Sequence, residues 1–534
     1  MSLVWLVLAV LTTAPYLVAE LRVPKGHIFS GVLTAYDDTF TYFAWMRQGA
    51  DGHLLMCDLF TSEPQSCEFL LPLWSALGFV SRLTGISIPL TFHAARLLAA
   101  LVLLAVARIV ASTVTKSRTR LRYSMWIYAF SGGLGWVVFV WNNWSDLFAA
   151  NAATGSVDLD LPEAIAFRSV FAQVHFTLGA VLLAGAVMLY VSALLEDKTG
   201  KAAIAGALVS ILAVVHPYMI VVAVAVVLAV SLARPWSGDK GSRAFDLYLS
   251  AARVTSVFGA ATIPGLAYLV YLNRSNDVLR EWLRITDTWS PAPWEYSLGF
   301  GLSGVLGVAG FCFIVKHRAR YGRPLLIWTL VQFALLYAPV SFQRRLVEGL
   351  QMPVSIAAAV AVFWATGAVF RHGNRARARK WVLAGVIVFT SLTNLGFITG
   401  QIVGRGSGAN DPRRYLNSDV VESLMWLREN AASDANLFSS YFTGNVAPSI
   451  TGLRVFLGHY GQTISSDQKG DQVTAFYSNQ MPDDVARQLF VEHRLNYVIY
   501  GPFEQTIARD FVPPSWLTPV HRIGDVQIFK VQLF

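Results

Sequence analysis

The sequence predicts an α-helical protein that crosses a membrane about 11 times and carries an α/β domain after its last span. Apolar residues make up 54% of the 534 residues and charged residues only 14%, against roughly 25% charged residues in soluble domains. With a mean hydropathy of +0.49, a soluble fold would lack the polar residues needed to cover its apolar surface. Beyond residue 403 the long apolar runs stop, and short helical and strand patterns alternate.

Most predicted spans have a length of about 17–25 residues, which crosses a bilayer. The fifth and sixth are separated at Pro217, because one helix through both would be too long and proline favours a break. The first is interpreted as a retained helix, since no basic segment precedes it; a cleaved signal peptide is the alternative. The runs are 3–21, 93–112, 123–143, 174–194, 202–217, 218–233, 250–272, 298–315, 324–341, 352–370 and 381–402.

The distribution of Lys and Arg predicts the orientation of the chain. One set of connections, at 116–122, 198–201, 234–243, 316–323 and 371–380, holds eighteen of them, and the short connections of the other set hold six. Because basic connections stay in the cytoplasm, we expect a cytoplasmic N-terminus and an extracytoplasmic C-terminus. The net charge of +9 is then mostly a topology signal, so the expected partner is the lipid bilayer and not a nucleic acid.

Two large parts are expected outside the membrane: the first outer loop, 22–92, and a domain at 404–534 that follows the membrane domain 1–403. In that domain we expect helices at 419–429 and 483–493, and strands at 437–441, 454–457, 497–500 and 526–531. The loop contains Cys57 and Cys67, which are close enough in sequence to pair in an oxidising compartment; two unpaired thiols are the alternative. With only Cys312 besides, a disulfide framework and a cysteine zinc site are excluded.

Polar residues collect at the expected outer ends of the spans. Ionisable residues at membrane depth are costly and mark functional sites by default, and their convergence on one face from distant parts of the chain predicts a binding site. The histidines taken singly are equally compatible with interfacial or helix-end positions. The candidates are His93 and Arg96 in the second span, His175 opening the fourth, His216 closing the fifth, and Arg344, Arg345 and Glu348 between the ninth and tenth.

The turn that contains Arg344 and Arg345 predicts a phosphate-binding site. Two adjacent like charges in a short turn repel each other unless an anion neutralises them. Glu348 can pair with one arginine, and the other presents the guanidinium fork that suits the oxygens of a phosphate or diphosphate.

The adjacent carboxylates Asp37 and Asp38 open an aromatic-rich amphipathic stretch at 36–47. A carboxylate held in such a place can act as a general base on an incoming hydroxyl. The alternative is a solvated turn in which the pair only caps the following helix.

With these features the chain resembles the integral-membrane glycosyltransferases of the GT-C superfamily, which include bacterial family 39-like transferases, protein O-mannosyltransferases and aminoarabinose transferases. Those proteins share an inside N-terminus, a large first outer loop with an acidic motif, many spans and often an outer C-terminal domain. Two stretches, from Asp38 through 61–64 to 83–85 and at 454–460, look like bacterial members, so we expect a bacterial inner membrane. In residues, the resemblance rests on Asp37-Asp38 with Tyr42, on the polar helix ends and on Arg344-Arg345.

The resemblance implies an inverting transferase that takes its sugar from a polyprenyl phosphate or diphosphate and glycosylates a glycan, lipid or protein on the outer face. A first-loop Asp would deprotonate the acceptor. The family pattern of an Asp followed four residues later by a Tyr matches Asp38 and Tyr42, which favours Asp38 over Asp37. The Asp-Asp order departs from the usual Asp-Glu and leaves the choice open. Arg344 and Arg345 would hold the lipid phosphate, which is also the leaving group.

The resemblance also implies roles for residues that flank the outer loops. Glu163, Arg168 and His175 would shape the sugar pocket, with ordinary loop polarity as the alternative. The family has metal-dependent and metal-independent members. Asp37, Asp38 and Glu63 offer oxygens to a divalent cation, but we expect no metal and no other cofactor.

A transporter or flippase for lipid-linked sugars, or another polytopic membrane protein without transferase activity, is the alternative class. Transporters place ionisable residues and broken helices near the midplane, within two related halves. Here the polar residues cluster at one face and the sequence shows no repeat, which favours the transferase.

Overall fold

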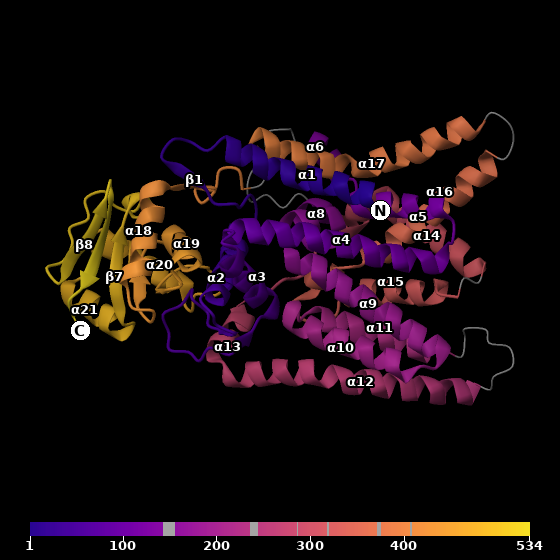
Figure 1. The fold of residues 1–534 in the computed structure, drawn as a ribbon, viewed down its shortest axis with the longest axis horizontal. Coiled ribbons are helices and arrows are strands. Elements are labelled where there is room, and N and C mark those ends of the chain that lie inside the picture. Colours follow the sequence, from indigo (N-terminus) through magenta and orange to yellow (C-terminus); the bar gives the residue numbers. More distant parts are fainter. Residues whose placement is uncertain are drawn as a thin grey trace. The chain divides into compact units, whose positions relative to one another are not determined.

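The computed structural model describes residues 1–141, 155–234, 244–285, 287–317, 320–370, 375–405 and 408–533, which are mainly helical (Figure 1). Among these residues, seven helices are long and apolar enough to cross a membrane, and three shorter apolar helices accompany them. The long ones are α1 (Ser2–Leu21), α4 (Ile88–Val114), α9 (Val174–Glu196), α12 (Ala244–Ser275), α14 (Pro293–Lys316), α16 (Gln351–Val369) and α17 (Arg375–Val403). The shorter ones are α10 (Thr199–Val215), α11 (Met219–Leu232) and α15 (Gly322–Leu335). The predicted multi-span helical architecture is confirmed.

The chain divides into two compact units. The first, which we call the helical unit, comprises Met1–Pro15, Ala94–Val270 and Asp287–Ser407. The second, the loop–tail unit, comprises Tyr16–His93, Tyr271–Thr286 and Gly408–Phe534. The first loop and the C-terminal segment thus belong to one unit, although most of the helical unit lies between them in sequence.

The predicted span at 123–143 is wrong as a continuous helix. Instead, α5 (Arg118–Phe130) ends and α6 (Gly135–Trp141) begins after a short non-helical stretch; residues 142 and 143 lie outside the described residues. The buried carboxylate of Asp158 accepts a hydrogen bond from the N–H of Gly133 at 2.7 Å, and the N–H of Gly132 donates to the carbonyl of Thr390 at 2.7 Å. Backbone groups at membrane depth need such protein partners, so the interruption is built into the fold.

Glycines set the closest helix approach in the helical unit. A Cβ at Gly310 of α14 would lie 1.8 Å from the carbonyl oxygen of Ala357 in α16, and one at Gly307 would lie 2.9 Å from Val354. Between apolar helices in lipid, close packing replaces the hydrophobic effect as the main source of stability. The α14–α16 contact therefore depends on having no side chain at these positions.

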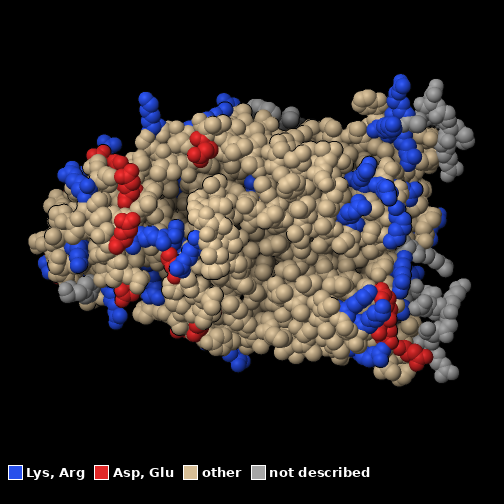
Figure 2. Space-filling view, viewed as in Figure 1, with Lys and Arg blue, Asp and Glu red and all other residues tan. Residues whose placement is uncertain are grey.

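Basic side chains gather at one end of the helical unit. On the face shown in Figure 2, Lys and Arg cluster at the right-hand end, and the middle of the unit's surface carries few charged residues. An uncharged band beside a basic end is what the hydropathy and charge pattern predicted. Residues 235–243, 318–319 and 371–374, which supply part of that predicted charge, lie outside the described residues.

In the loop–tail unit, strand β1 (His27–Phe29) pairs antiparallel with β4 (Tyr415–Asn417), so the first loop is joined directly to the tail. Helices α2 (Tyr36–Ala50) and α3 (Pro72–Thr84) cross closely, because a Cβ at Gly78 would lie 2.0 Å from the carbonyl of Met46. Strands β2 (Leu55–Met56) and β3 (Phe69–Leu70) pair beside a disulfide between Cys57 and Cys67. The cysteine pairing that the sequence allowed is present.

The tail folds as the predicted α/β domain around a five-stranded sheet of order β6-β5-β7-β9-β8. Strand β5 runs parallel to β6 and β7, whereas β9 runs antiparallel to β7 and β8. Its core is rich in aromatic residues, among them Phe438, Phe476, Phe490 and Trp516. The strands are β5 (Asn436–Phe438), β6 (Arg454–Val455), β7 (Leu495–Tyr500), β8 (Leu517–Ile523) and β9 (Val526–Val531), with helices α18 (Ser418–Asn430), α19 (Tyr441–Thr451), α20 (Ser466–Tyr477) and α21 (Asp483–Glu492).

Four of the domain's six predicted elements need little correction, and the other two are shorter than expected. The strand expected at 437–441 ends at Phe438, because Ser440 caps helix α19 with its side chain. The strand expected at 454–457 ends at Val455. Helices α19 and α20 and strand β8 were not predicted.

We expect Gly310→Ala to lower the stability of the protein by about 1–3 kcal/mol, the usual cost of overpacking, because its Cβ would clash with the carbonyl of Ala357. The matched control is Gly259→Ala on α12, where a Cβ meets nothing within 4 Å. The measurement is thermal unfolding of the purified protein in detergent. Equal melting temperatures for the two variants would contradict the described α14–α16 contact.

Candidate functional site

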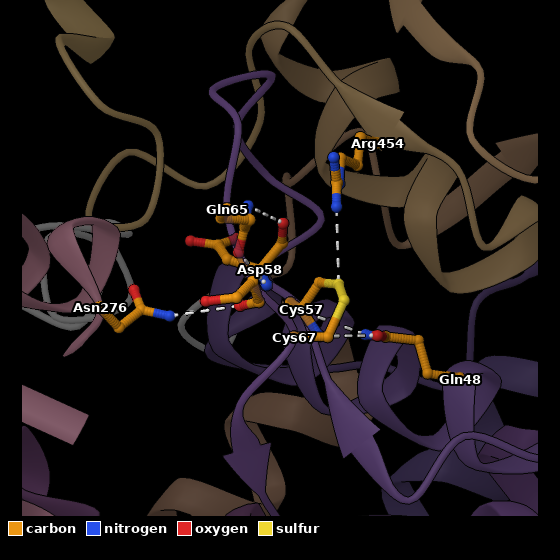
Figure 3. The surroundings of a disulfide bond; sticks show 8 residues. Gln48, Cys57, Asp58, Gln65, Cys67, Asn276 and Arg454 are labelled. Carbon is orange, nitrogen blue, oxygen red and sulfur yellow. Dashed lines mark hydrogen bonds between the residues drawn. A yellow bond between two sulfur atoms is a disulfide. The ribbon is translucent and has the colours of Figure 1, made fainter. Parts of the chain in front are cut away.

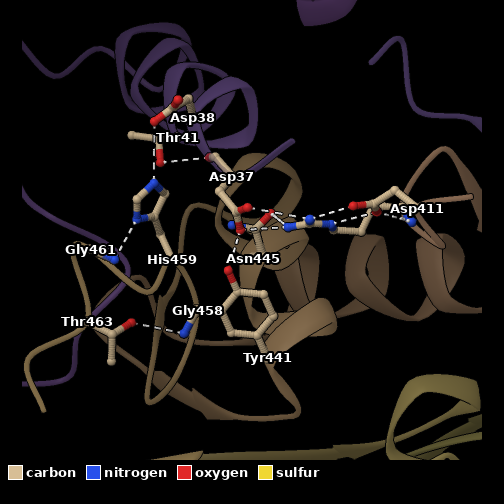
Figure 4. Close-up of polar contacts among 11 residues, drawn as sticks. Asp37, Asp38, Thr41, Asp411, Tyr441, Asn445, Gly458, His459, Gly461 and Thr463 are labelled. Atoms are coloured by element: carbon tan, nitrogen blue, oxygen red, sulfur yellow. Dashed lines mark hydrogen bonds and ion pairs between the residues drawn. The ribbon is translucent and has the colours of Figure 1, made fainter. Parts of the chain in front are cut away.

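Helix α2 carries the acidic pair in its first turn, and its two carboxylates have different partners (Figure 4). The cap residue is Ala35, whose backbone is left-handed with a φ of 50°, and it contributes no side-chain hydrogen bond. The capping role considered for Asp37 and Asp38 is therefore wrong. Both side chains instead contact residues of the C-terminal segment.

Asp37 is held by two donors. Nη1 of Arg413 donates to its Oδ1 at 2.7 Å, and the hydroxyl of Tyr441 donates to the same oxygen at 2.5 Å. The buried Arg413 also donates to Asp411 at 2.7 Å and to the amide oxygen of Asn445 at 2.8 Å. Burial alone would lower the pKa of Arg413, but its hydrogen bonds to Asp411 and Asp37 raise it. A permanent cation therefore neutralises Asp37.

Tyr441 stays a hydrogen-bond donor in this arrangement. Burial, followed by the negative charge of Asp37, raises the pKa of its hydroxyl. The phenol is therefore neutral across the physiological range and keeps its proton for the carboxylate.

Asp38 faces His459, from the stretch at 454–460 that carried part of the resemblance. Nε2 of the imidazole is 3.5 Å from Oδ1 of Asp38, and the N–H of Gly461 donates to Nδ1 at 3.0 Å. Because Nδ1 accepts a hydrogen bond, the proton of the neutral ring is on Nε2 and points toward the carboxylate. The side chain of Asp38 is 60% exposed, against 26% for Asp37, so Asp38 is the more accessible of the two carboxylates.

Asp411, Arg413 and Tyr441 were not predicted as site residues. Asp411 and Arg413 lie between the last predicted span and the first helix expected in the tail, where no element was predicted, and Tyr441 lay in a stretch expected to be a strand. One signal was available: an Asp and two Arg residues stand within four positions, at 411–414, right after a glycine-rich linker. Charges placed there need partners, and the acidic pair of the first loop supplies one.

In the helical unit, a second group of predicted residues comes together. His216, between α10 and α11, has Nδ1 at 2.6 Å from Oε2 of Glu348, and both side chains are buried. The ring of His175 is 5.4 Å from that of His216. Glu163, in the turn Pro162–Ala164, acts electrostatically on both members of the pair. Gly179 makes room for them, since a Cβ there would lie 2.0 Å from Oε1 of Glu348.

Arg344 and Arg345 lie in a 3-10 turn, Gln343–Val347, just before α16. The turn is fixed by Gln332 of α15, whose amide donates to the carbonyls of Leu346 and Glu348, each at 2.7 Å. The guanidinium of Arg345 lies over the ring of Tyr218 at 5.0 Å. Glu348 pairs with His216, and the positive charge of Arg345 also acts on it.

Three further candidates contribute to packing. The imidazole of His93 contacts the carbonyl of Gly31 through Nε2 at 2.9 Å. The fully buried Arg96 donates to backbone carbonyls of α1 and of α8 (Ala166–Ala172) at 3.2 and 3.0 Å. Arg168 donates to the carbonyl of Leu159 at 3.0 Å and lies 3.4 Å over the ring of Phe397. Their predicted contacts with substrate stay predictions.

The carboxylates considered for a divalent cation have other partners. Glu63 forms an ion pair with Lys469 at 2.7 Å, and Asp37 is neutralised by Arg413. Hard divalent cations prefer uncompensated oxygens and take six or more of them, so these side chains fit such an ion poorly.

Tyr42, one turn after Asp38, stacks on Trp74 with ring centroids 4.5 Å apart.

The disulfide-closed loop, residues 57–67, contacts strand β6: Nη2 of Arg454 is 3.6 Å from Sγ of Cys57 (Figure 3), and the N–H of Val455 donates to the carbonyl of Leu59 at 2.9 Å. Gln48 of α2 holds it by accepting from the N–H of Cys57 at 2.9 Å and donating to its carbonyl at 3.1 Å. Asp58 is buried inside the loop and accepts from the N–H of Phe60 at 2.8 Å. Burial raises the pKa of Asp58 to about 7, although that hydrogen bond opposes the shift.

Comparisons with known proteins agree with this architecture at the level of the fold. No protein-family model and no curated protein sequence matches the chain. Among solved structures, the chain is similar to the oligosaccharyltransferase of Archaeoglobus fulgidus tethered with an acceptor peptide, with a TM-score of 0.53 and 13% identity over 93% of this chain and 68% of that one. The same enzyme in complex with an inhibitory peptide and a dolichol-phosphate gives the same four values.

A third similar structure is the arabinofuranosyltransferase AftD from Mycobacteria, with a TM-score of 0.55 and 14% identity over 98% of this chain. The chain covers 40% of that larger protein. Both neighbours are membrane glycosyltransferases of the GT-C superfamily. The chain therefore has the GT-C fold, as its resemblance to that superfamily predicted.

The stability of the loop–tail unit should fall as pH rises from about 4 to about 7. In the unfolded chain Asp58 ionises near its ordinary value of 3.8, whereas the folded protein keeps it protonated until about pH 7. Across that window the folded state binds more protons, so raising the pH favours unfolding. We expect Asp58→Asn, which cannot ionise, to remove this slope.

The measurement is the unfolding midpoint at pH 5 and pH 8 for wild type, Asp58→Asn and the exposed-site control Asp471→Asn. The control should keep the wild-type slope. An unchanged slope in Asp58→Asn would show that the buried carboxyl does not titrate in this window.

Proposed function

We propose that the protein is an inverting membrane glycosyltransferase, which moves a sugar from a polyprenyl phosphate or diphosphate to an acceptor hydroxyl. The observation that carries the proposal is the difference in partners and exposure between the two carboxylates of the acidic pair. Asp37 is neutralised by Arg413, while Asp38 is exposed and faces the Nε2–H of His459. The GT-C fold supports the same class of reaction, because its solved members include glycosyltransferases.

In the proposed reaction Asp38 takes the proton from the acceptor hydroxyl as its oxygen attacks the anomeric carbon. The bond from that carbon to the phosphate oxygen breaks, the electron pair leaves with the phosphate, and a single displacement inverts the carbon. His459 orients the carboxylate through its Nε2–H. Asp37 is less suited to be the base because its Oδ1 already accepts from Arg413 and Tyr441.

We assign the lipid phosphate to Arg344 and Arg345. Negative charge grows on the leaving oxygen in the transition state, and a cation fixed beforehand lowers the barrier. Gln332 holds the backbone of their turn, so little reorganisation is needed. His175, His216, Glu163 and Glu348 lie together in the same unit, and we propose that they shape the sugar and phosphate pocket with Arg168.

We place the reaction on the outer face of a bacterial inner membrane, with the N-terminus in the cytoplasm. The basic end of the helical unit supports this orientation, since basic connections stay inside. The disulfide in the first loop supports it independently, because disulfides persist in oxidising compartments outside the cytoplasm. The Archaeoglobus oligosaccharyltransferase binds a peptide and dolichol-phosphate; here the acceptor is a glycan, a lipid or a protein.

Replacing the proposed base should stop sugar transfer. We expect Asp38→Asn to lower the rate from radiolabelled polyprenyl-phosphate sugars about 10²- to 10⁴-fold, the range for a lost general base. Asp37→Asn should cost less in rate and more in stability, because it leaves Arg413 with one carboxylate fewer. The measurement is transfer in reconstituted vesicles, alongside the thermal midpoint of each variant.

A collapse in Asp37→Asn alone, with a normal midpoint, would move the base by one residue. Donor that is bound and translocated without being consumed, across a broad panel of sugars, would overturn the transferase and favour a flippase.

Removing a phosphate-binding cation should weaken donor use. We expect Arg345→Gln to raise the donor KM and lower kcat, with about a tenfold to hundredfold loss in kcat/KM, since charge-assisted hydrogen bonds to phosphate are worth about 1.5–3 kcal/mol. Arg345→Lys should recover part of the loss because it keeps the charge without the fork. The control is Arg284→Gln, an exposed arginine paired with Glu281. Wild-type kinetics in Arg345→Gln would remove this residue from the site.

A further inference from the structure

A polar pocket with a volume of about 610 Å³ lies at one end of the C-terminal sheet. The parallel strands β6, β5 and β7 all begin at this end, and the register places Arg454 beside Asn436. Strand β9 runs the opposite way and brings Lys530 beside Tyr497. The disulfide-closed loop adds Ser62, Pro64 and Gln65 to the lining. Five separate segments of the loop–tail unit thus converge on one hollow.

The pocket is built with an excess of positive charge. Arg454, Arg494 and Lys530 line it, and Asp434 is the one carboxylate in the lining. Asp434 and the buried Asp58 act electrostatically on Arg454, whereas no ion pair of Arg494 or Lys530 is found within the part of the chain that the structure describes. Cations gathered around one hollow repel each other unless an anion enters. The lining therefore favours a ligand with negative charge.

Amide side chains complete the lining. Asn430, Asn496 and Gln65 border the hollow together with Asn436. Asn436 is only 5% exposed, and its Oδ1 has no hydrogen-bond partner among the described residues. Each amide already uses part of its hydrogen-bonding capacity within the protein: Gln65 bonds to the backbone of Asp58 through both groups, and the three asparagines use one group each. The remaining donors and acceptors of the asparagines suit a ligand that carries hydroxyl groups. A volume of this size lies within the usual range for small-molecule sites, about 300–1,000 Å³.

We propose that this pocket binds an acidic sugar of the acceptor, with its carboxylate or phosphate group on the three cations and its hydroxyls on the amides. The demand for an anionic ligand rich in hydroxyls comes from the pocket itself. Its assignment to the acceptor rests on the proposed transferase function. The site would select acceptors by charge at a place distinct from the acidic pair of α2.

The test is calorimetric titration of the full-length protein in nanodiscs. Four probes are used: an oligogalacturonate, a hexose 6-phosphate, a neutral maltooligosaccharide and inorganic phosphate. We expect one acidic sugar to bind, with affinity that falls as salt rises, and whichever binds identifies the source of the anionic group. Arg494→Gln and Lys530→Gln should each weaken binding about tenfold or more. The control Arg522→Gln removes the same charge from β8, near the other end of the sheet, and should bind as wild type.

Equal binding of the neutral sugar, or equal losses in the control, would overturn the proposal. Inorganic phosphate binding as tightly as the sugar phosphate would overturn the sugar assignment. Sugar transfer from a polyprenyl donor is measured on the same preparation. Transfer without binding of any acidic sugar overturns the pocket alone, whereas acidic-sugar binding without transfer supports the pocket and counts against the transferase.

Discussion

The ion pair between Asp37 and Arg413 is the contact on which the candidate site depends. It joins the first turn of α2 to the start of the C-terminal segment, across a sequence separation of 376 residues. Because Arg413 is buried with Asp411 and Asn445 around it, its position is over-determined, and the carboxylate that binds it is fixed as well. The neighbouring residue on the helix, Asp38, is then presented outward in a defined direction. Asp37 thus anchors the start of the helix, and Asp38 remains the more exposed of the two carboxylates.

Much of the fold followed from local patterns. Apolar runs of bilayer length predicted ten of the helices, since a segment in lipid must satisfy its backbone internally whatever surrounds it. The run at 123–143 was equally apolar, but its helix is interrupted where Asp158 receives backbone N–H groups from a distant segment. This hydrogen bond depends on the tertiary structure, so the residues around position 132 cannot reveal it.

The candidate site was predictable to a smaller degree, for the same reason. The acidic pair, the arginine turn and the histidines stood out because charge is unusual in so apolar a chain. Arg413 and Tyr441 did not, because arginine and tyrosine are ordinary in a soluble segment and their importance comes from what the fold places beside them. The geometry of His459 also depends on the fold, because its tautomer is set by the backbone N–H of Gly461, which the folded turn directs at the ring.

The helical unit shows how polar groups are kept in an apolar setting. Gln332 receives a hydrogen bond from Trp328 at 2.7 Å while donating to two carbonyls of the arginine turn. Gln351 likewise links the carbonyl of Ser131 to the N–H of Ala166. Each amide uses both its donor and its acceptor, so each is buried without loss. These residues hold the non-helical turns on which the charged candidates stand.

The disulfide between Cys57 and Cys67 has a consequence for biosynthesis. Its cysteines are 10 residues apart, whereas Arg454, which covers the loop, lies 397 residues beyond Cys57. A ribosome that has made the first loop still has most of the chain to translate, so the crosslink can close long before its cover exists. During that interval the loop is held in shape covalently, and the late-arriving tail meets a surface already formed. Oxidative folding at the start of the chain thereby prepares the docking of its end.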